Sequence, residues 1–555
     1  MFDKGLNNSE SLDSSGSEVT AGGRGVSRRS VAKGAAWSVP VVATAVSVPA
    51  QAASACDPST YTINFLPVGS VPAPGYSFPD VDGLLSVQVT APADCPAITG
   101  NVVLTVTSSN ANFTTKDTGP NTVTIALNGA GIATFGTANS GNPLFLACGL
   151  KPGDSVTVHA QIEGTSVETS SGGNGDDMQI NIGNLYGWGT NSYEGNGTGH
   201  NRNVPVQVGA NNPKTDWANI SASNYFSLAM DSTNDLYAIG YNGYGQLGLG
   251  DTTARQVFTQ VPAPSGGGSW VSFCTGFSFS LALSSTGELY ASGRNDFGQL
   301  GLGDTTNRDS FTQVPFPDGV TSWKSVSVGD GHSLALSSTG TLYATGHNIY
   351  GQIALDSPDD YLAFTKVTNI PEGAWTIIYA AGSTSFIIDS NGVMYGTGVN
   401  SSGELGLGDT TNRDSFTQVA APSGGGTWTG IESGGWSSLA LSSTGDLYAT
   451  GVNSSGELGL GDTTNRDSFT QVAAPSGESW TNNLQIGYLS ASGYTFQYSL
   501  VLGSSGILYA TGDNQYGELG LGDATNRNVF TALSGCPNWK QVTAGSGLSL
   551  GIMNS

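Results

Sequence analysis

Short runs of alternating apolar and polar residues, separated by glycine-rich turns, make up most of the chain. In one such segment, Ser280–Leu283 and Leu289–Ser292 have the two-residue period of strands and are joined by a Ser-Thr-Gly turn. Tight turns at Gly298–Gly303 follow, and a further strand is predicted at Phe311–Val314. Because no helical period accompanies this glycine density, helical repeats are excluded and an all-β fold is predicted.

This segment belongs to a repeat that occurs seven times. A Gly-x-Asn motif marks the copies at Gly189, Gly240, Gly293, Gly346, Gly398, Gly451 and Gly512. A tryptophan opens the units at Trp217, Trp270, Trp323, Trp375, Trp428, Trp480 and Trp539. Gly398–Gly424 recurs letter for letter at Gly451–Gly477, which indicates a recent internal duplication. Units of roughly 50 residues with three or four short strands are typical of β-propeller blades.

The two ends of the repeat array complement each other. Trp539–Ile552 contains only the opening part of a unit, and Leu185–Val208 contains only the closing part. Together they supply one blade, which predicts a seven-bladed β-propeller closed by joining N- and C-terminal strands. Closure removes the exposed sheet edges that an open array would leave.

The string N-x-x-G-Q-L-G-L-G-D at Asn242–Asp251, with its copies, resembles the regulator of chromosome condensation repeat. The resemblance covers 184–555 and implies a seven-bladed propeller. The founder of that family exchanges nucleotide on a small GTPase, but no exchange-site residue is matched here, so we do not expect that activity. The family also includes secreted bacterial propellers, among them a β-lactamase inhibitor, that bind proteins on one face.

The first residues read as an export signal, assigned to 1–52. The pair Arg28 and Arg29 precedes a short apolar stretch that ends in Ala-Gln-Ala, and paired arginines favour the twin-arginine route over an ordinary Sec signal. Cleavage is expected after Ala52, with Ala55 as the alternative. The mature protein is therefore expected to be secreted or at the cell surface. No later apolar run is long enough to predict a membrane span.

Residues 53–164 read as short alternating strands between turn residues, which favours a β-sandwich, immunoglobulin-like in architecture. A small polar linker, 165–183, separates this domain from the propeller at 184–555. Cys95 and Cys148 would staple the sandwich if they pair, and an exported protein permits such a disulfide. Lipidation at Cys56 stays open.

Composition narrows the range of partners and cofactors. The 555 residues include 18 Lys and Arg against 42 Asp and Glu, a formal charge of -24. That acidity argues against nucleic acid, whose phosphates need clustered basic residues. The cysteine spacings and the scattered histidines fit no metal pattern, and no phosphate-binding loop is present, so neither a metal nor a cofactor is expected.

An Asp/Arg pair four residues apart recurs in five units. Because the pair repeats with the fold, we interpret it as fixing a turn rather than as an active site. The pairs are Asp251/Arg255, Asp304/Arg308, Asp409/Arg413, Asp462/Arg466 and Asp523/Arg527. The Gly-Leu-Gly-Asp loops lack the closely spaced carboxylates of a calcium site.

Function on a repeat scaffold is expected where the repeats differ. The loops before the second strand of each unit vary most, and they carry several aromatic side chains of the kind that anchor protein interfaces. The candidate binding residues are Tyr225, Phe226, Phe277, Phe279, Asp330, His332, Trp436 and Tyr494. The alternative for each is packing between blades. Two units also depart from the motif, one of them at His347–Asp360.

These features predict an exported, monomeric, non-enzymatic binding protein that recognises an extracellular protein or a cell-wall glycan with loops on one propeller face. One alternative is a secreted inhibitor of a hydrolase. Another is an envelope enzyme acting on polysaccharide, which would need carboxylates such as Asp330 and Asp359 to converge to roughly 5–9.5 Å.

Overall fold

The structure is a computed structural model. It describes residues 184–190, 202–208, 214–223, 225–371, 373–491, 494–533 and 538–554, and also the backbone of seven strands between Thr62 and Asn181. For 489–491 and 494–496 it describes the backbone alone. All regular elements in this part of the chain are strands, and it holds no helix of the length and apolarity needed to cross a bilayer.

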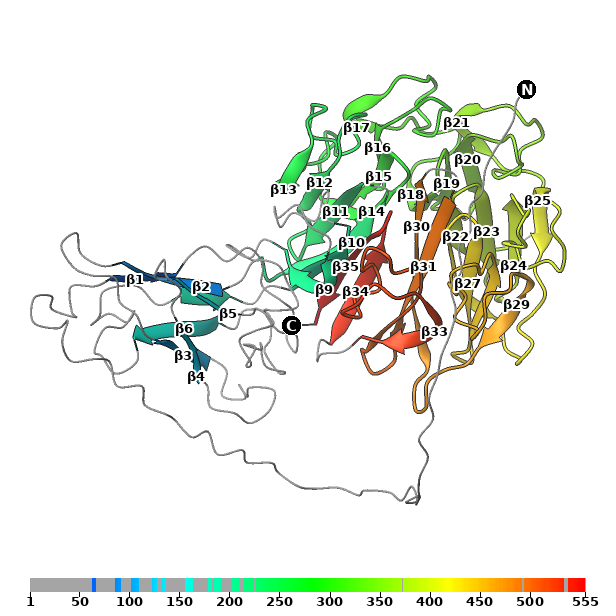
Figure 1. Cartoon of the computed structure of the whole chain (residues 1–555). Coiled ribbons are helices and arrows are strands. Elements are labelled where there is room, and N and C mark those ends of the chain that lie inside the picture. Colours follow the sequence, from blue (N-terminus) through cyan, green and yellow to red (C-terminus); the bar gives the residue numbers. More distant parts are fainter. Residues whose placement is uncertain are drawn as a thin grey trace, which may run out of the picture. The chain divides into compact units, whose positions relative to one another are not determined.

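Residues from 185 onward form seven four-stranded antiparallel sheets, numbered here as blades 1 to 7 (Figure 1). The first strands of blades 1 to 7 are β10 (Trp217–Ala222), β14 (Trp270–Thr275), β18 (Trp323–Val328), β22 (Trp375–Ala381), β26 (Trp428–Ser433), β30 (Trp480–Ala491) and β34 (Trp539–Ala544). The second strands are β11 (Phe226–Asp231), β15 (Phe279–Ser284), β19 (His332–Ser337), β23 (Thr384–Asp389), β27 (Ser437–Ser442), β31 (Tyr494–Gly503) and β35 (Leu548–Met553).

The outer half of each blade has the same regularity. The third strands are β12 (Leu236–Gly240), β16 (Leu289–Gly293), β20 (Leu342–Gly346), β24 (Met394–Gly398), β28 (Leu447–Gly451), β32 (Leu508–Gly512) and β8 (Leu185–Gly189). The fourth strands are β13 (Arg255–Gln260), β17 (Arg308–Gln313), β21 (Tyr361–Lys366), β25 (Arg413–Gln418), β29 (Arg466–Val472), β33 (Arg527–Ala532) and β9 (Arg202–Gln207). The all-β, seven-bladed propeller predicted from the repeats is therefore confirmed.

The seventh blade closes the ring with strands from both ends of the array. Its strand order is β34-β35-β8-β9, and Leu550 of β35 pairs with Gly187 of β8. In Figure 1 the red C-terminal strands β34 and β35 lie beside β10, the first strand of blade 1, which they contact. Every blade thus gains a neighbour on both sides, as the sequence predicted, and no blade presents an unpaired face to solvent.

The tryptophan that opens each unit begins the first strand and packs edge-on against a tyrosine of the third strand. Ring centroids in six of the seven pairs lie 5.2–5.9 Å apart, and those of Trp539 and Tyr186 in blade 7 lie 6.0 Å apart. Near-perpendicular aromatic pairs contribute about 0.5–1.5 kcal/mol beyond their buried area.

The hydrophobic cores lie between blades rather than within them. One cluster joins Phe226, Leu228 and Leu247 of blade 1 to Trp270 and Tyr290 of blade 2. A single β-sheet cannot bury both of its faces alone, so each blade depends on its neighbours for stability.

The glycine-rich turn after the third strand locks adjacent blades together. Asn242 is fully buried, donates to the Asp251 carbonyl at 2.8 Å and accepts from the Leu247 amide at 3.0 Å. A Cβ on Gly248, where φ is +66°, would lie 2.3 Å from the Phe311 ring of the next blade. Only glycine permits this approach and this conformation together.

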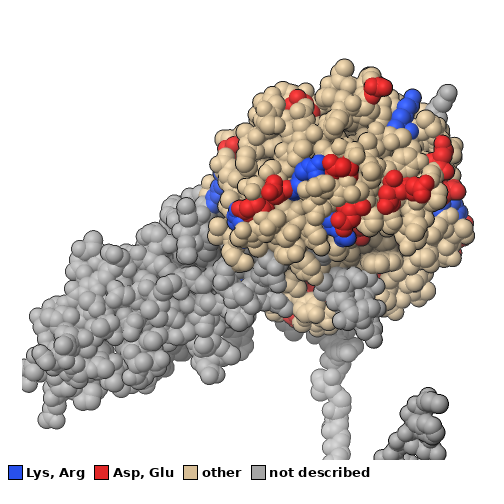
Figure 2. Space-filling view, turned by 90° about the horizontal axis from the view of Figure 1, so that it is seen from above, with Lys and Arg blue, Asp and Glu red and all other residues tan. Residues whose placement is uncertain are grey.

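The five Asp/Arg pairs all form within these turns, with N–O distances of 2.6–2.7 Å. Each arginine also donates to the carbonyl of the intervening threonine, as Arg255 does to Thr253. The pairs therefore fix a turn in the way the sequence indicated. Figure 2 shows basic side chains next to acidic ones on the propeller surface in view, with the acidic groups in excess.

The N-terminal strands form two further antiparallel sheets. One has the order β1-β2-β5 and the other β4-β3-β6-β7. Their bounds are β1 Thr62–Phe65, β2 Leu85–Thr90, β3 Asn101–Ser108, β4 Thr122–Ala126, β5 Ile132–Phe135, β6 Ser155–Ile162 and β7 Met178–Asn181. The strand β7 pairs with β6 although its residues had been assigned to the linker.

Several predicted features lie outside the described residues. They are the export signal with Arg28 and Arg29, the cleavage position Ala52, and the cysteines Cys56, Cys95 and Cys148. The sandwich packing of the two N-terminal sheets likewise stays a prediction.

Candidate binding site at the channel mouth

The up-and-down path of every blade brings the most variable loops to one end of the propeller. Each first strand runs toward this end, and the loop that joins it to the second strand emerges there. We call this end the mouth face and the other end, which carries the turns between second and third strands, the base face. Tyr225, Phe277, Asp330 and Trp436 all belong to mouth-face loops.

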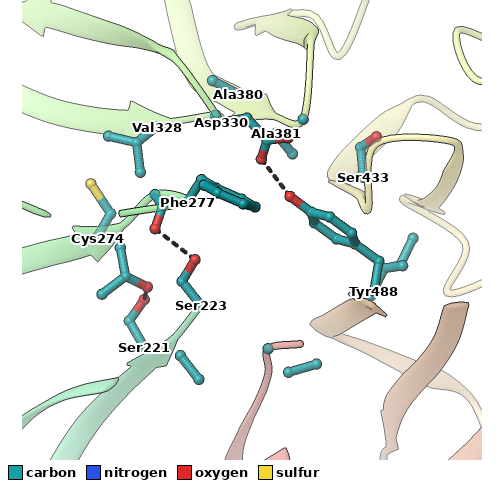
Figure 3. A pocket seen from close by; sticks show the side chains of 18 of the residues that line it. Ser221, Ser223, Cys274, Phe277, Val328, Asp330, Ala380, Ala381, Ser433 and Tyr488 are labelled. Carbon is teal, nitrogen blue, oxygen red and sulfur yellow. Dashed lines mark hydrogen bonds between the residues drawn. The ribbon is translucent and has the colours of Figure 1, made fainter. Parts of the chain in front are cut away.

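A cavity of about 220 Å³ opens at the centre of the mouth face (Figure 3). Residues from the first strand, or the loop after it, of all seven blades line the cavity. The first strands contact one another in a ring, so this cavity is the mouth of the central channel of the propeller.

One position in each first strand supplies a channel-lining side chain. In six blades it is the fifth residue of the strand, and in blade 6, where the strand is longer, it is the sixth. The residues are Ser221, Cys274, Ser327, Tyr379, Glu432, Gln485 and Thr543. The tryptophans at the start of these strands do not vary, whereas this position differs in nearly every blade.

Hydrogen bonds between neighbouring blades hold the small polar members of this ring. The hydroxyls of Ser221 and Thr275 lie 2.8 Å apart, and Ser223 donates to the Gly276 carbonyl at 2.6 Å. Ser327 accepts from the Ala380 amide at 2.9 Å. The rim is thus rigid backbone and short side chains, which positions its larger groups with little freedom.

Tyr488 and Asp330 meet across the mouth. The Tyr488 hydroxyl donates to the Asp330 carboxylate at 2.5 Å, and these residues belong to blades 6 and 3 (Figure 3). Burial raises the pKa of the Asp330 carboxyl, and the hydrogen bond from Tyr488 lowers it in part. Burial also raises the pKa of Tyr488 well above its ordinary value. The ring of Trp436 packs edge-on to Tyr488 at 5.8 Å.

Glu432 and Tyr379 form a second carboxylate–phenol contact in the same cavity. Burial raises the pKa of Glu432 to about 8, although hydrogen bonds from Tyr379 and from the Ile486 amide oppose that rise. The Tyr379 hydroxyl also lies 3.3 Å from the Ser433 carbonyl, which competes with Glu432 for its one proton. Neither carboxylate has an ion-pair partner among the described residues.

The candidate binding residues fall into two groups. Phe277 and Asp330 line the cavity, Trp436 contacts its rim through Tyr488, and Tyr225 is 40% exposed in the loop of blade 1. These four side chains share one face of the propeller.

Three other candidates are core residues. Phe226, Phe279 and His332 open their second strands with no exposed surface, so their side chains pack between blades, the alternative stated for them above. His332 Nε2 lies 2.9 Å from the Ser385 hydroxyl, and burial lowers its pKa to about 3. The side chain of Tyr494 lies outside the described residues.

Three residues of the site were not predicted from the sequence, namely Glu432, Tyr379 and Tyr488. The sequence analysis considered the loops before the second strands, whereas Glu432 and Tyr379 belong to first strands. The signal was nonetheless present, because the position four residues after the opening tryptophan, or five in blade 6, changes from blade to blade. Tyr488 and the candidate Tyr494 belong to the same long hairpin of blade 6, formed by β30 and β31.

The unit that departs from the motif at His347–Asp360 forms a separate hollow. Ile349 and Tyr350 are 58% and 45% exposed there, and His347 stacks on Phe297 with centroids 4.5 Å apart. Asp359 accepts from the Ser357 hydroxyl at 2.5 Å, whereas Asp330 is bonded to Tyr488. The two carboxylates considered for an envelope enzyme therefore have different partners.

Metal-ligating side chains do not gather in the described part of the chain. It contains no group of three or more His, Cys, Asp or Glu side chains with the spacing to hold a metal ion. Cys274 is a free thiol at the channel, and burial raises its pKa to about 12, which leaves it protonated and unreactive at neutral pH.

Fold and site together define a closed seven-bladed propeller with a polar and aromatic channel mouth. The propeller contains regulator of chromosome condensation repeats. Two family models, both described as regulator of chromosome condensation (RCC1) repeat, match parts of this chain. One covers residues 234–283, 286–336 and 505–552, and the other covers 217–246, 270–299 and 323–352.

Curated proteins with similar sequences come from plants and animals. The chain is 27% identical to the ultraviolet-B receptor UVR8 of Arabidopsis thaliana over 354 residues, which are 63% of this chain and 77% of that protein. It is 32% identical over 200 residues to the human probable E3 ubiquitin-protein ligase HERC4, covering 35% of this chain and 18% of that one.

Solved structures agree on the fold. Human WBSCR16 superposes with a TM-score of 0.57 at 17% identity, covering 67% of this chain and 99% of that one. Prp20p of Saccharomyces cerevisiae superposes with a TM-score of 0.55 at 19% identity, covering 68% of this chain and 93% of that one. Its structure was described together with its binding to Gsp1p and histones. At these identities the likeness concerns the fold alone.

Proposed function

We propose that this chain is an exported, non-enzymatic binding protein that recognises a protein partner with the mouth face of its propeller. The observation that carries the proposal is the placement of Tyr225, Phe277, Trp436 and Tyr488 at one face, around a channel lined by every blade. Aromatic side chains that are half-buried before binding lose little conformational entropy and anchor interfaces well.

Further facts support a protein partner and the export of the chain. Prp20p, which shares the fold, is described with Gsp1p and histones, and also in complex with Kap60, so propellers of this shape do receive proteins. Export is supported by the paired arginines and the Ala-Gln-Ala site near the N-terminus. The acidity of the chain favours partners with basic or neutral surfaces.

The test compares matched variants on the two faces. A partner captured by the full chain from secreted and envelope proteins is purified, and its affinity is measured for Tyr225→Ala, Trp436→Ala and Ile507→Ala. Ile507 is 39% exposed at a base-face turn and so matches Tyr225 in exposure. We expect the mouth-face changes to weaken binding at least about tenfold. Unchanged affinity in both, or capture of a glycan instead of a protein, would contradict the proposal.

A further inference from the structure

The carboxyl groups at the channel mouth have no basic side chain to pair with. Among the side chains that line it, Asp330 and Glu432 are carboxylates, and none is Lys, Arg or His. Their only hydrogen-bond donors in the described structure are neutral, namely the two tyrosines and one backbone amide. A carboxylate removed from water is stabilised far better by a cation than by neutral donors.

Aromatic rings and carboxylates alternate around the mouth. Phe277 of blade 2, Asp330 of blade 3, Tyr379 of blade 4, Glu432 of blade 5 and Tyr488 of blade 6 follow one another, and all line the same cavity. Aromatic faces attract cations, and a desolvated cation gains most from them. Both kinds of group in the ring therefore favour the same class of ligand.

A further polar group at this site has no partner. The side chain of Ser546, in the loop of blade 7, is 3% exposed, and its hydroxyl makes no hydrogen bond within the described structure. Ser546 belongs to the lining of the same cavity. A buried hydroxyl without a partner costs roughly 1–3 kcal/mol, so a ligand that donates to it would recover that cost.

We propose that the channel mouth binds an alkylammonium group, with Glu432 and Asp330 as its anionic acceptors and the aromatic rings as its walls. An ammonium has three donors and no acceptor, which suits a ring of carboxylates, hydroxyls and carbonyls. A volume of about 220 Å³ admits one extended amine-bearing side chain and excludes a folded segment. This inference rests on the proposed function and names the chemical group of the ligand that enters the mouth.

The same group can come from a lysine side chain of a partner protein or from a small free amine, so the experiment uses both. Calorimetric titration of the full chain with N-acetyl-lysine methylamide and with n-butylammonium measures the affinity. Their neutral analogues, N-acetylnorleucine methylamide and n-butanol, are titrated alongside. We expect at least one ammonium ligand to bind with a dissociation constant of roughly 1 mM or tighter, at least tenfold tighter than its neutral analogue.

Variants locate the site. Glu432→Gln removes the ionisable carboxyl but keeps the shape, and it should weaken ammonium binding by about tenfold to a hundredfold. Asp318→Asn likewise replaces a carboxyl with an amide, at an exposed position of a base-face loop, and should leave the affinity unchanged. If Glu432→Gln fails to fold, Asp330→Asn serves in its place.

The two ligand arms and the partner assay separate the possible outcomes. Binding of the lysine derivative points to a protein side chain as the source, and binding of n-butylammonium alone points to a free amine. Equal affinity for charged and neutral ligands, no binding of either ammonium, or binding of Ca²⁺ in their place would overturn the inference. If the partner still depends on Tyr225 and Trp436 in that case, the proposed function stands without it.

Discussion

The hydroxyl of Tyr488 donates a hydrogen bond to the carboxylate of Asp330 at 2.5 Å, although the two residues are 158 positions apart in the chain. The bond spans the channel mouth from blade 6 to blade 3 and joins the longest hairpin of the propeller to the opposite rim. The hydrogen bond opposes the rise that burial causes in the pKa of Asp330.

Removing the phenol should therefore affect both stability and titration. Tyr488→Phe is expected to destabilise the propeller by about 1–2 kcal/mol and to raise the pKa of Asp330 further, because burial then acts without the opposing hydrogen bond. Thermal unfolding of the wild type, of Tyr488→Phe, of Asp330→Asn and of the double variant gives the coupling energy of the pair in a double-mutant cycle. A coupling energy near zero would show that the bond contributes nothing.

Buried glutamates make the propeller sensitive to pH. Glu404 accepts the Ser402 amide at 2.7 Å, in the position where Gln299 accepts the Phe297 amide in blade 2. Burial raises the pKa of Glu404 from 4.5 to about 7. The folded state therefore holds the proton more tightly, and the stability that this provides is complete below pH 4.5 and is lost as pH rises through about 7.

Glu404→Gln should thus raise the free energy of unfolding by about 2–3 kcal/mol at pH 8 and by little at pH 4. Denaturant unfolding at both pH values checks this, with Glu288→Gln, whose half-buried carboxylate lies at a base-face turn and accepts from the Gln313 amide, as the control. An equal gain at the two pH values would mean that the effect does not come from ionisation.

Within the repeated turn, the asparagine should contribute more to the free energy of unfolding than the Asp/Arg ion pair does. Asn295 is fully buried, accepts the Leu300 amide at 3.0 Å and donates to the Asp304 carbonyl at 2.8 Å. Asn295→Ala should cost about 2–4 kcal/mol because it leaves buried backbone groups unpaired. Arg308→Ala breaks a partly exposed pair and should cost about 1 kcal/mol or less. Thermal unfolding of the two variants ranks them, and the reverse order would be inconsistent with this interpretation of the motif.

Because the ring is closed by pairing of β35 with β8, a substitution that destabilises β35 should also destabilise β8. Leu550 of β35 is 1% exposed and pairs with Gly187 of β8. Leu550→Ala should cost about 2–5 kcal/mol and reduce hydrogen-exchange protection in β8 and β9 as well as in β34. Loss of protection in β34 alone would mean that the two ends fold independently.

The fold was predictable because it is built from a local pattern repeated in phase. Each opening tryptophan begins a first strand, and each Gly-x-Asn motif begins at the end of a third strand, so the number of blades and the closure followed from residues such as Trp539 and Gly189. The site was less accessible. Phe226 and Phe279 border variable loops, yet the second strand is buried on both faces, so exposure cannot be judged from proximity to a loop.

The partners of the channel residues were not predictable in the same way. Asp330 was a candidate because it varies, but its contact with Tyr488 depends on the diameter of the ring and on the length of one hairpin. Glu432 and Tyr379 become recognisable only when the first strands are aligned on their tryptophans. Contacts between residues of different blades depend on the geometry of the closed ring, which the sequence of a single repeat does not determine.

The most direct test of the account is a hydrogen-exchange footprint of the purified partner on the full chain. We expect protection of the mouth-face loops around Tyr225, Phe277 and Trp436 and of the hairpin that carries Tyr488. The base-face segments around Asp318 and Ile507 should be unchanged. Protection confined to the base face, or to the N-terminal strands, would contradict it.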